Sequence, residues 1–205
     1  MKKMIICLVA CICFTVPAKA ADICDIIVVV DQSGSIYHNM PVIKEYIKKS
    51  IFGKIAKKDD YIYIFSFDGN FNYSGLIRGN EPPEKIDPIL NKIQPYGQHT
   101  DLTNAVEKMT HTIQEKIKTG SRKVVFFLTD GVNDPPRDSP YREGLQHRFF
   151  QESKKSVAGG GWAVYVTSIG QKTDGAKVAG LVGAEYVELS ERPTLSEFDA
   201  KLTSK

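Results

Sequence analysis

Cysteine is scarce in this chain, and most of it lies at the amino terminus. The sequence has 205 residues and four cysteines, of which only Cys24 lies beyond residue 20. A single cysteine cannot form an internal disulfide, which excludes a small domain held by a disulfide framework. Cys24 opens an apolar run, and we interpret it as a small buried hydrophobic residue. The alternative is a reactive or pairing thiol.

The chain has one long hydrophobic run, at its amino terminus, and no second one. The run that begins the chain covers residues 4–16; it follows Lys2 and Lys3 and is followed by small residues that end at Ala20. This order is typical of a secretory signal peptide, and the run is too short to span a bilayer as a helix. The sequence therefore predicts a signal peptide over residues 1–20 and no integral membrane segment in the mature chain.

The predicted leader indicates where the mature protein is found. Its removal leaves residues 21–205, a length typical of one domain. Export from a bacterial cell leads to the periplasm, the cell surface or the medium, and all three remain open. Residues 8–11 also resemble the lipobox of a bacterial lipoprotein, with Cys11 as the lipidated residue. The apolar stretch before Cys11 is short and continues past it, which favours ordinary cleavage.

Neither sign of charge is in excess once the leader is removed. The whole chain carries 27 Lys and Arg against 24 Asp and Glu, and three of the lysines, Lys2, Lys3 and Lys19, belong to the leader. The mature chain is therefore balanced. Its composition indicates neither a nucleic-acid partner nor an anionic membrane partner.

Several catalytic signatures are absent from the sequence. There is no Gly-x-Ser-x-Gly nucleophile elbow and no Cys–His cluster. The glycines at 159–161 precede a predicted strand, whereas a dinucleotide-binding loop follows one. A metal-dependent phosphohydrolase with Asp31 as nucleophile would need a second aspartate two residues later, where the chain has Ser33. We therefore expect the protein not to be an enzyme.

A buried strand that ends in oxygen-bearing side chains is the most informative feature present. Residues 26–30 are all Ile or Val, which is typical of a strand buried on both faces of a parallel sheet. Asp31, Ser33 and Ser35 follow at alternate positions. Open α/β sheets bind ligands at the carboxyl ends of their strands, so these oxygens indicate a site for a hard cation.

The rest of the chain alternates between strands and amphipathic helices. This predicts an α/β fold: a doubly wound, mostly parallel sheet with helices on both faces. We expect six strands in the order 3-2-1-4-5-6, and an antiparallel edge strand because Asp68-Gly69 between two apolar runs is a hairpin signal. The predicted strands are 26–30, 61–67, 72–78, 123–128, 162–169 and 185–189, and the predicted helices are 40–51, 82–93, 101–118, a helix from Leu145, 177–182 and 195–202.

Two further polar segments are expected at the same edge of the sheet. Thr100 and Asp101 open the long helix that leads into the fourth strand, and Asp130 follows that strand in a Thr-Asp-Gly turn. The first and fourth strands are neighbours where the strand order reverses, so their loops flank one crevice. Singly, these residues have ordinary explanations as turn or cap residues. Together we interpret them as one site.

The ordered set resembles the metal-ion-dependent adhesion site of von Willebrand factor type A (vWA) domains. That site has Asp-x-Ser-x-Ser after the first strand, then a Thr, and then an Asp after the fourth strand. The resemblance covers about residues 24–203 of a single domain over 21–205, and it implies a Rossmann-like fold. The chain has all five residues of the motif: Asp31, Ser33, Ser35, Thr100 and Asp130.

The resemblance also implies a cofactor and a partner. The cofactor is Mg²⁺, with Mn²⁺ or Ca²⁺ as alternatives, because the three hydroxyls and two carboxylates are hard oxygen ligands. In the family, an open coordination position accepts an Asp or Glu carboxylate of a partner protein. We expect Asp101 to cap its helix or support the site and His99 to be an exposed loop residue. The candidate partner contacts are Gln32, His99, Asp101 and Gly131.

Three functions follow from these residues. The favoured one is an exported, divalent-metal-dependent protein-binding module that acts in adhesion or interaction. The alternative is a scaffold subunit of a cell-envelope assembly in which a structural metal holds the loops. The least favoured is the metal-dependent phosphohydrolase.

Overall fold

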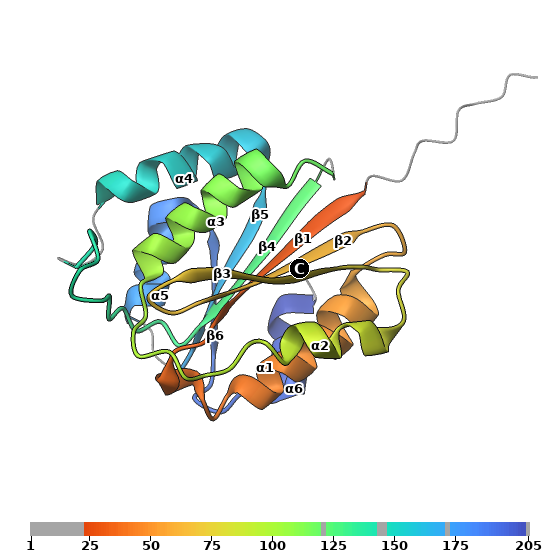
Figure 1. Ribbon diagram of the computed structural model, residues 1–205. Helices are drawn as coiled ribbons and strands as arrows, with labels where there is room; N and C mark the ends of the chain where they lie inside the picture. The colour runs from red at the N-terminus through yellow and green to blue at the C-terminus, as the bar shows by residue number, and fades with distance from the viewer. Residues whose placement is uncertain (1–22, 120–121, 143–146, 171–172, 204–205) are drawn as a thin grey trace, which may run out of the picture.

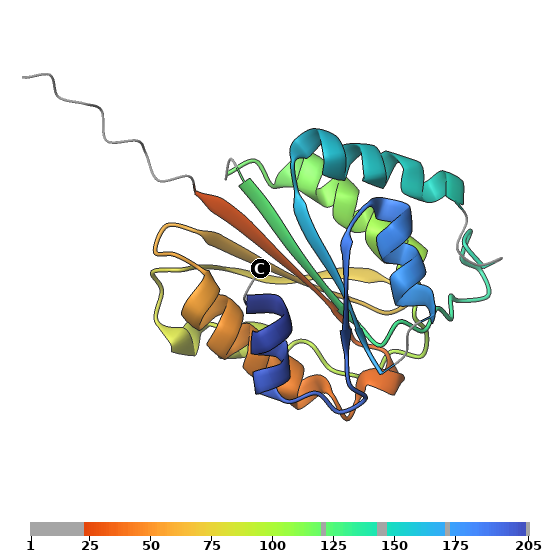
Figure 2. The same ribbon diagram turned by 180° about the vertical axis from the view of Figure 1, so that it is seen from behind.

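The computed structural model describes residues 23–119, 122–142, 147–170 and 173–203 (Figures 1 and 2). The predicted leader and Leu145 therefore lie outside the described residues. A six-stranded sheet forms the centre, in the order β3-β2-β1-β4-β5-β6. The strands are β1 (Cys24–Asp31), β2 (Tyr61–Phe67), β3 (Phe71–Arg78), β4 (Arg122–Thr129), β5 (Ala163–Ile169) and β6 (Glu185–Leu189).

The strand order and directions confirm the predicted fold. Every neighbouring pair is parallel except β2 and β3, which are antiparallel. The hairpin between them turns at Asp68, whose backbone N–H donates to the carbonyl of Asn70 (3.0 Å) and whose Oδ1 accepts the Asn70 N–H (2.7 Å). The Asp-Gly signal thus marks a real turn, and β3 closes one edge of the sheet.

Helices cover both faces of the sheet (Figures 1 and 2). One face packs against η1 (Gly34–Ile36), α1 (Met40–Tyr46), η2 (Ile47–Ile55), α2 (Asp87–Leu90), α6 (Leu195–Phe198) and η4 (Asp199–Thr203). The other face packs against α3 (Leu102–Lys116), α4 (His147–Gly160) and α5 (Thr173–Val182). In the described part of the chain, every helix is too short or too polar to span a bilayer.

Strand β1 is buried on both faces, as its Ile and Val run predicts. Alternate residues of a strand point to opposite faces, so Ile26 and Val28 join one core layer while Ile27 and Val29 join the other. All four side chains are at most 1% exposed. The strand therefore sits at the centre of the domain, and its carboxyl end is held rigidly by both layers.

The helix predicted over 82–93 is broken in the structure. A 3₁₀ turn, η3 (Pro83–Lys85), is followed by the single turn α2. Pro88 has no N–H to donate to the Glu84 carbonyl, so the turn that begins at Pro83 cannot continue as one α-helix. Pro88 instead lies in the first turn of α2, where no such N–H is needed. The apolar positions are nevertheless buried, including Ile86, Leu90 and Ile93.

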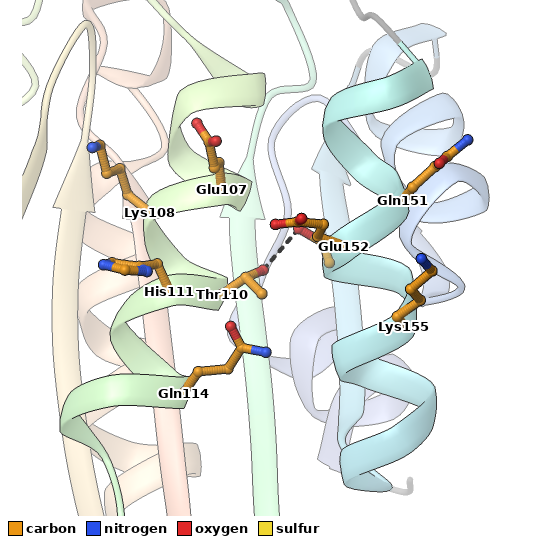
Figure 3. A pocket seen from close by; sticks show the side chains of 9 residues that line it. Glu107, Lys108, Thr110, His111, Gln114, Gln151, Glu152 and Lys155 are labelled. Atoms are coloured by element: carbon orange, nitrogen blue, oxygen red, sulfur yellow. Dashed lines mark hydrogen bonds between the residues drawn. The ribbon is translucent and has the colours of Figure 1, made fainter.

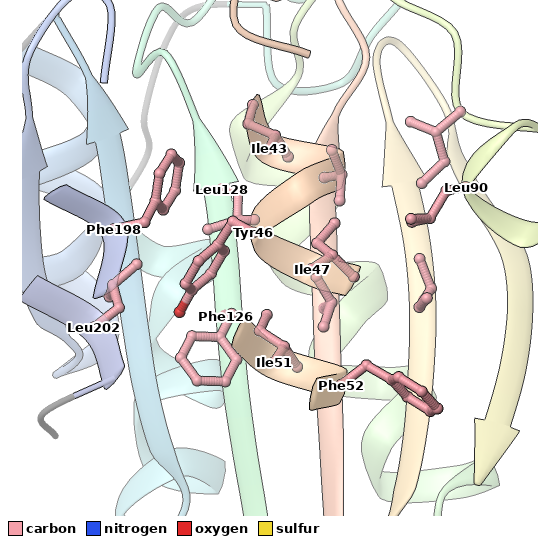
Figure 4. Packing of buried hydrophobic residues seen from close by; sticks show 14 of the residues in the cluster. Ile43, Tyr46, Ile47, Ile51, Phe52, Leu90, Phe126, Leu128, Phe198 and Leu202 are labelled. Atoms are coloured by element: carbon pink, nitrogen blue, oxygen red, sulfur yellow. The ribbon is translucent and has the colours of Figure 1, made fainter. Parts of the chain in front are cut away.

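The first and last helices pack together beside the sheet. Figure 4 shows Tyr46 of α1 against Phe198 of α6, and their ring centroids are 4.5 Å apart. The helix predicted over 40–51 continues to Ile55, with a π-helical second half, and the one predicted over 195–202 is confirmed as α6 and η4. Because η2 continues α1 and η4 continues α6, this contact holds all four helical segments on the same face of the sheet.

Thr167 on β5 gives a stability prediction. Its side chain is fully buried, and its hydroxyl has no hydrogen-bond partner among the described residues. A buried hydroxyl without a partner costs about 1–3 kcal/mol, so Thr167→Val, which keeps the shape, should raise the free energy of unfolding by about 1 kcal/mol. Urea denaturation measures this.

Thr110 on α3 is the matched control. Its hydroxyl donates to the Val106 carbonyl (2.8 Å) and bonds Ser153 of α4 (2.9 Å), at the floor of a polar groove of about 560 Å³ between the helices (Figure 3). Thr110→Val removes these bonds and should lower the free energy of unfolding by about 1–2 kcal/mol. Destabilisation by both substitutions would contradict the assignment of Thr167.

Candidate metal centre

Three loops meet at the carboxyl edge of the sheet, around the ends of β1 and β4. The Gly34 N–H donates to the Gly97 carbonyl (2.8 Å), and the Gly97 N–H donates to the Gln32 carbonyl (3.0 Å). The amides of Thr100 and Asp134 each donate to the other's carbonyl, at 2.9 and 2.8 Å. These backbone bridges tie the loop after β1 to the loop before α3, and that loop to the one after β4.

Asp31 ends β1 and is fully buried. Its Oδ1 accepts the backbone N–H of Ser33 (2.8 Å), and its Oδ2 accepts the hydroxyl of Thr129 at the end of β4 (2.7 Å). The Ser33 and Ser35 hydroxyl oxygens are 3.0 Å apart. The Asp-x-Ser-x-Ser segment therefore bends back on itself and brings its two hydroxyls together.

Asp130 follows β4 in a tight turn and is 6% exposed. Gly131 has a φ of 79°, a left-handed conformation that glycine adopts without strain. This turn lets the Gly131 N–H donate to the Thr129 hydroxyl (3.0 Å) and the Val132 N–H donate to Asp130 Oδ1 (3.1 Å). Thr129 thus links the turn at Gly131 to Asp31, because the same hydroxyl also donates to the Asp31 carboxylate.

The two carboxylates repel each other in a buried setting. Burial is the largest cause that raises the pKa of Asp31, to about 7, and the charge of Asp130 raises it further. Hydrogen bonds from Ser33 and Thr129 oppose the shift. The ionised form of Asp31 is therefore only partly stabilised by the protein's own donors.

Thr100 and Asp101 have different surroundings at the start of α3. Thr100 is 3% exposed, and its backbone is paired with Asp134. Asp101 is the N-cap of α3: its Oδ1 accepts the Asn104 N–H (2.9 Å), and its Oδ2 accepts the Ser139 hydroxyl (2.5 Å). The expectation that Asp101 caps the helix is confirmed for Oδ1, and Oδ2 is occupied by the bond to Ser139.

The other three candidate partner contacts also border these loops. The Gln32 side-chain amide donates to Asp68 Oδ2 (3.0 Å). His99 is a loop residue but only partly exposed: its side chain is 40% exposed, whereas Nδ1 is buried, 3.8 Å from Asp134 Oδ2, with no hydrogen-bond partner among the described residues. Gly131 is buried and has no side chain to offer a partner; its part in these loops is the left-handed turn after β4.

Sequence reasoning missed two residues that brace this edge. The Asp68 carbonyl accepts the Asp101 N–H (2.9 Å), which joins the β2–β3 turn to the start of α3. Asn133 Oδ1 accepts the Leu102 N–H (3.0 Å), which joins the loop after β4 to the same helix. Asp68 carried a usable signal, because it is an aspartate directly after a buried strand, as Asp31 and Asp130 are.

The residue types at this edge suit a hard cation. Among the described residues, no group of three or more His, Cys, Asp or Glu side chains gathers as a metal site. The candidate centre is of another kind, with two carboxylates and three hydroxyls, and oxygen ligands of this type are used by Mg²⁺, Mn²⁺ and Ca²⁺. The burial of both Asp31 and Asp130 fits such an ion, since the two positive charges of a divalent cation would balance the two negative charges of the carboxylates.

The fold matches solved structures at low sequence identity. BatB, a conserved hypothetical protein of Bacteroides thetaiotaomicron, is 17% identical with a TM-score of 0.59, over 86% of this chain and 94% of that one. The PilB minor pilin of Streptococcus sanguinis gives 14% and 0.61, over 90% and 60%. Manganese-loaded TRAP protein of Plasmodium vivax gives 16% and 0.55, over 86% and 72%. These likenesses show a shared fold.

Sequence comparison places the chain in a family. An uncharacterized protein of Treponema pallidum (strain Nichols) is 27% identical over 130 residues, which are 61% of this chain and 57% of that protein, so the match spans little more than half of the relative's length. A family model described as von Willebrand factor type A domain matches residues 26–133, more than half of the chain. The chain therefore belongs to the von Willebrand factor type A domain family.

Proposed function

We propose that this chain is an exported, non-enzymatic vWA domain that binds a partner protein through a divalent cation. The family is one whose modules commonly mediate protein interaction. The cation is Mg²⁺, or Mn²⁺ or Ca²⁺ in its place, and the group it receives is an Asp or Glu carboxylate of the partner. The residues that would hold the cation are Asp31, Ser33, Ser35, Thr100 and Asp130.

The buried carboxylate pair is the observation that carries this proposal. Asp31 is fully buried and Asp130 nearly so, and the charge of Asp130 adds to the cost of ionising Asp31. A folded protein retains such a pair at a cost, and a divalent cation is the simplest group that relieves it. The adjacent Ser33 and Ser35 hydroxyls supply neutral oxygens, so the ion keeps enough positive charge to accept an outside carboxylate.

The protein's own residues prepare this site in two ways. Hydrogen bonds from Ser33 and Thr129 orient both oxygens of Asp31. The backbone bridge between Thr100 and Asp134 fixes the loop that carries the Thr100 hydroxyl. When bound, the cation supplies an electrophilic position for the partner's carboxylate.

Two of the structural neighbours support the proposal by analogy. The TRAP protein is described as manganese-loaded, which is a precedent for a divalent ion on this fold. PilB is described as a minor pilin, which is a precedent for a surface protein. Together with the predicted leader over residues 1–20, the second precedent favours export to the periplasm, the cell surface or the medium.

The bridges between the loops favour a binding role over a structural one. The loops around Gly34, Gly97, Thr100 and Asp134 are joined by four backbone hydrogen bonds made entirely by the protein. A metal that served only to hold these loops would add little to them. In the scaffold alternative, partner binding would not depend on the metal.

Calorimetric titration of Mg²⁺ into the purified mature chain tests the metal site. The wild type should give a binding isotherm, and Asp31→Ala and Thr100→Ala should give none. Asp60→Asn is the control: Asp60 is also buried, but it accepts the Cys24 and Lys57 amides (2.9 and 2.8 Å) at the opposite edge of the sheet. It should bind Mg²⁺ like the wild type. Identical isotherms for all four proteins would exclude the metal site.

A chelation experiment separates the two binding functions. Immobilised mature chain is exposed to a native cell-envelope extract in Mg²⁺ and then eluted with EDTA, beside an Asp31→Ala column. A metal-dependent module should release its partner into EDTA and capture none on the variant. Capture that survives both EDTA and Asp31→Ala would favour the scaffold.

A further inference from the structure

The charges of the mature chain cancel in number but are separated in space. The carboxyl edge of the sheet carries aspartates on its loops, among them Asp31, Asp68, Asp101, Asp130 and Asp134. The amino edge carries lysines and arginines. Strand β1 has eight residues, so about 26 Å separates the two edges at ~3.3 Å per residue. That exceeds the screening length of about 8–10 Å at physiological salt, so each edge acts independently on a partner.

Strand pairing brings the basic residues of the amino edge together. Cys24 of β1 pairs with Arg122 of β4, and Asp25 pairs with Tyr61 of β2. The segments that enter β2 and β4 therefore flank the start of β1. We define the basic edge by the five exposed cationic residues of these segments: Lys57, Lys58, Lys116, Lys118 and Arg122.

The cations of the basic edge are not neutralised by their neighbours. Within the described parts of the chain, none of the five forms an ion pair. Two nearby aspartates are buried and bond other groups of the protein: Asp25 forms an ion pair with Lys123, and Asp60 accepts the backbone amides of Cys24 and Lys57. Asp59 and Glu115, the residue before Lys116, are exposed carboxylates on the same segments. When Asp59, Asp60 and Glu115 are counted against them, the five cations still leave a net positive surface.

Helix dipoles do not account for this surface. Basic residues often lie in the last turn of a helix, where they offset its partial negative charge. Lys116 occupies such a position in α3. Lys57, Lys58 and Lys118 lie in connecting loops, and Arg122 begins a strand. The cluster therefore needs another explanation.

We propose that the basic edge docks on the anionic phospholipid headgroups of a bilayer. The occupant follows first from charge, because the net positive charge of these exposed side chains complements the phosphate of lipid headgroups. Strand β1 also begins at Cys24 on this edge, so the end of the mature chain from which the predicted leader is cleaved at the membrane lies here. Docked in this way, the domain turns its carboxyl edge, with the candidate metal centre, away from the bilayer.

Vesicle co-sedimentation of the full mature chain tests the proposal. The protein should pellet with phosphatidylcholine vesicles that contain phosphatidylglycerol, but not with pure phosphatidylcholine, at about 0.1 M salt, and should be released near 1 M salt, where screening falls to ~3 Å. The double variant Lys58→Glu/Lys118→Glu should bind at least ~10-fold more weakly, because each basic residue near an anionic surface contributes a factor of several. The control Lys155→Glu/Lys177→Glu makes the same change in net charge at exposed sites on α4 and α5.

The proposal would be overturned by no binding to the anionic vesicles, by equal binding to neutral vesicles, or by an equal loss in the two double variants. Binding abolished by EDTA or by Asp31→Ala would also overturn it, because it would place the lipid contact at the carboxyl edge. The basic edge and the metal centre are independent: Lys58→Glu/Lys118→Glu should keep the calorimetric Mg²⁺ isotherm, so failure of one proposal is distinguishable from failure of the other.

Discussion

Asp31→Asn is expected to stabilise the metal-free protein at pH 8 by about 2 kcal/mol and to abolish its stabilisation by Mg²⁺. A pKa raised from 3.8 to about 7 makes ionised Asp31 about 4 kcal/mol less favourable in the fold, at ~1.4 kcal/mol per pKa unit. Asparagine has nearly the same shape and no charge. It keeps only part of the hydrogen bonding to Ser33 and Thr129, worth about 1 kcal/mol each, which sets the smaller net gain.

Urea denaturation with and without Mg²⁺ measures both effects. The wild type should gain about 2.7 kcal/mol at a Mg²⁺ concentration about 100 times its Kd, and Asp31→Asn should gain nothing. Asp60→Asn should show the opposite pattern: a less stable apoprotein, because two buried amides lose their carboxylate acceptor, with a full response to Mg²⁺. A Mg²⁺ response that persists in Asp31→Asn would contradict the assignment of this carboxylate.

The metal-free wild type should lose stability as the pH rises from about 4 to 7. Asp31 has a folded-state pKa of about 7 and an unfolded-state value near 3.8. Between these values the folded chain binds more protons than the unfolded chain, so the free energy of unfolding falls with rising pH, by up to about 4 kcal/mol, and levels off above pH 7. Urea midpoints in EDTA across this range measure the change.

Mg²⁺ should reverse the trend, because only the ionised carboxylate is a ligand. Stabilisation by the metal should therefore grow as the pH rises through 7. Asp31→Asn provides the control, since it removes the titrating group and should flatten the curve in EDTA. A metal-free wild type whose stability is constant over this range would show that Asp31 is ionised without cost, and that the buried pair does not call for a cation.

Much of the fold was predictable because its signals are local. The Ile and Val run of residues 26–30 indicates a doubly buried strand wherever it occurs, and the Asp68-Gly69 turn indicates a hairpin. Right-handed crossovers then restrict the strand order. The continuous helix over 82–93 was predicted wrongly. The spacing of its apolar residues identified correctly which side chains are buried, but the prediction took no account of Pro88, which lacks the N–H that a continuous helix needs there.

The candidate site was predictable in its residues but not in its construction. Asp31 and Asp130 were identified by their positions directly after buried strands. The hydrogen bonds that join the loops were not identified, because they depend on contacts between distant segments. The Asp68 carbonyl accepts the Asp101 N–H, and Asn133 Oδ1 accepts the Leu102 N–H. The raised pKa of Asp31 likewise follows from burial and a neighbouring charge, neither of which is written in the local sequence.

The sequence by itself determined the fold class, the strand order and the candidate ligand set, because hydrophobic periodicity and turn residues act over a few positions. The tertiary structure decided how three loops are joined by backbone bridges and how a chain of balanced charge presents an acidic edge and a basic one. Composition indicated no anionic partner because it sums charges without regard to position. Parallel strand pairing sorts them, since it gathers the entries of the five parallel strands at one edge of the sheet and their exits at the other.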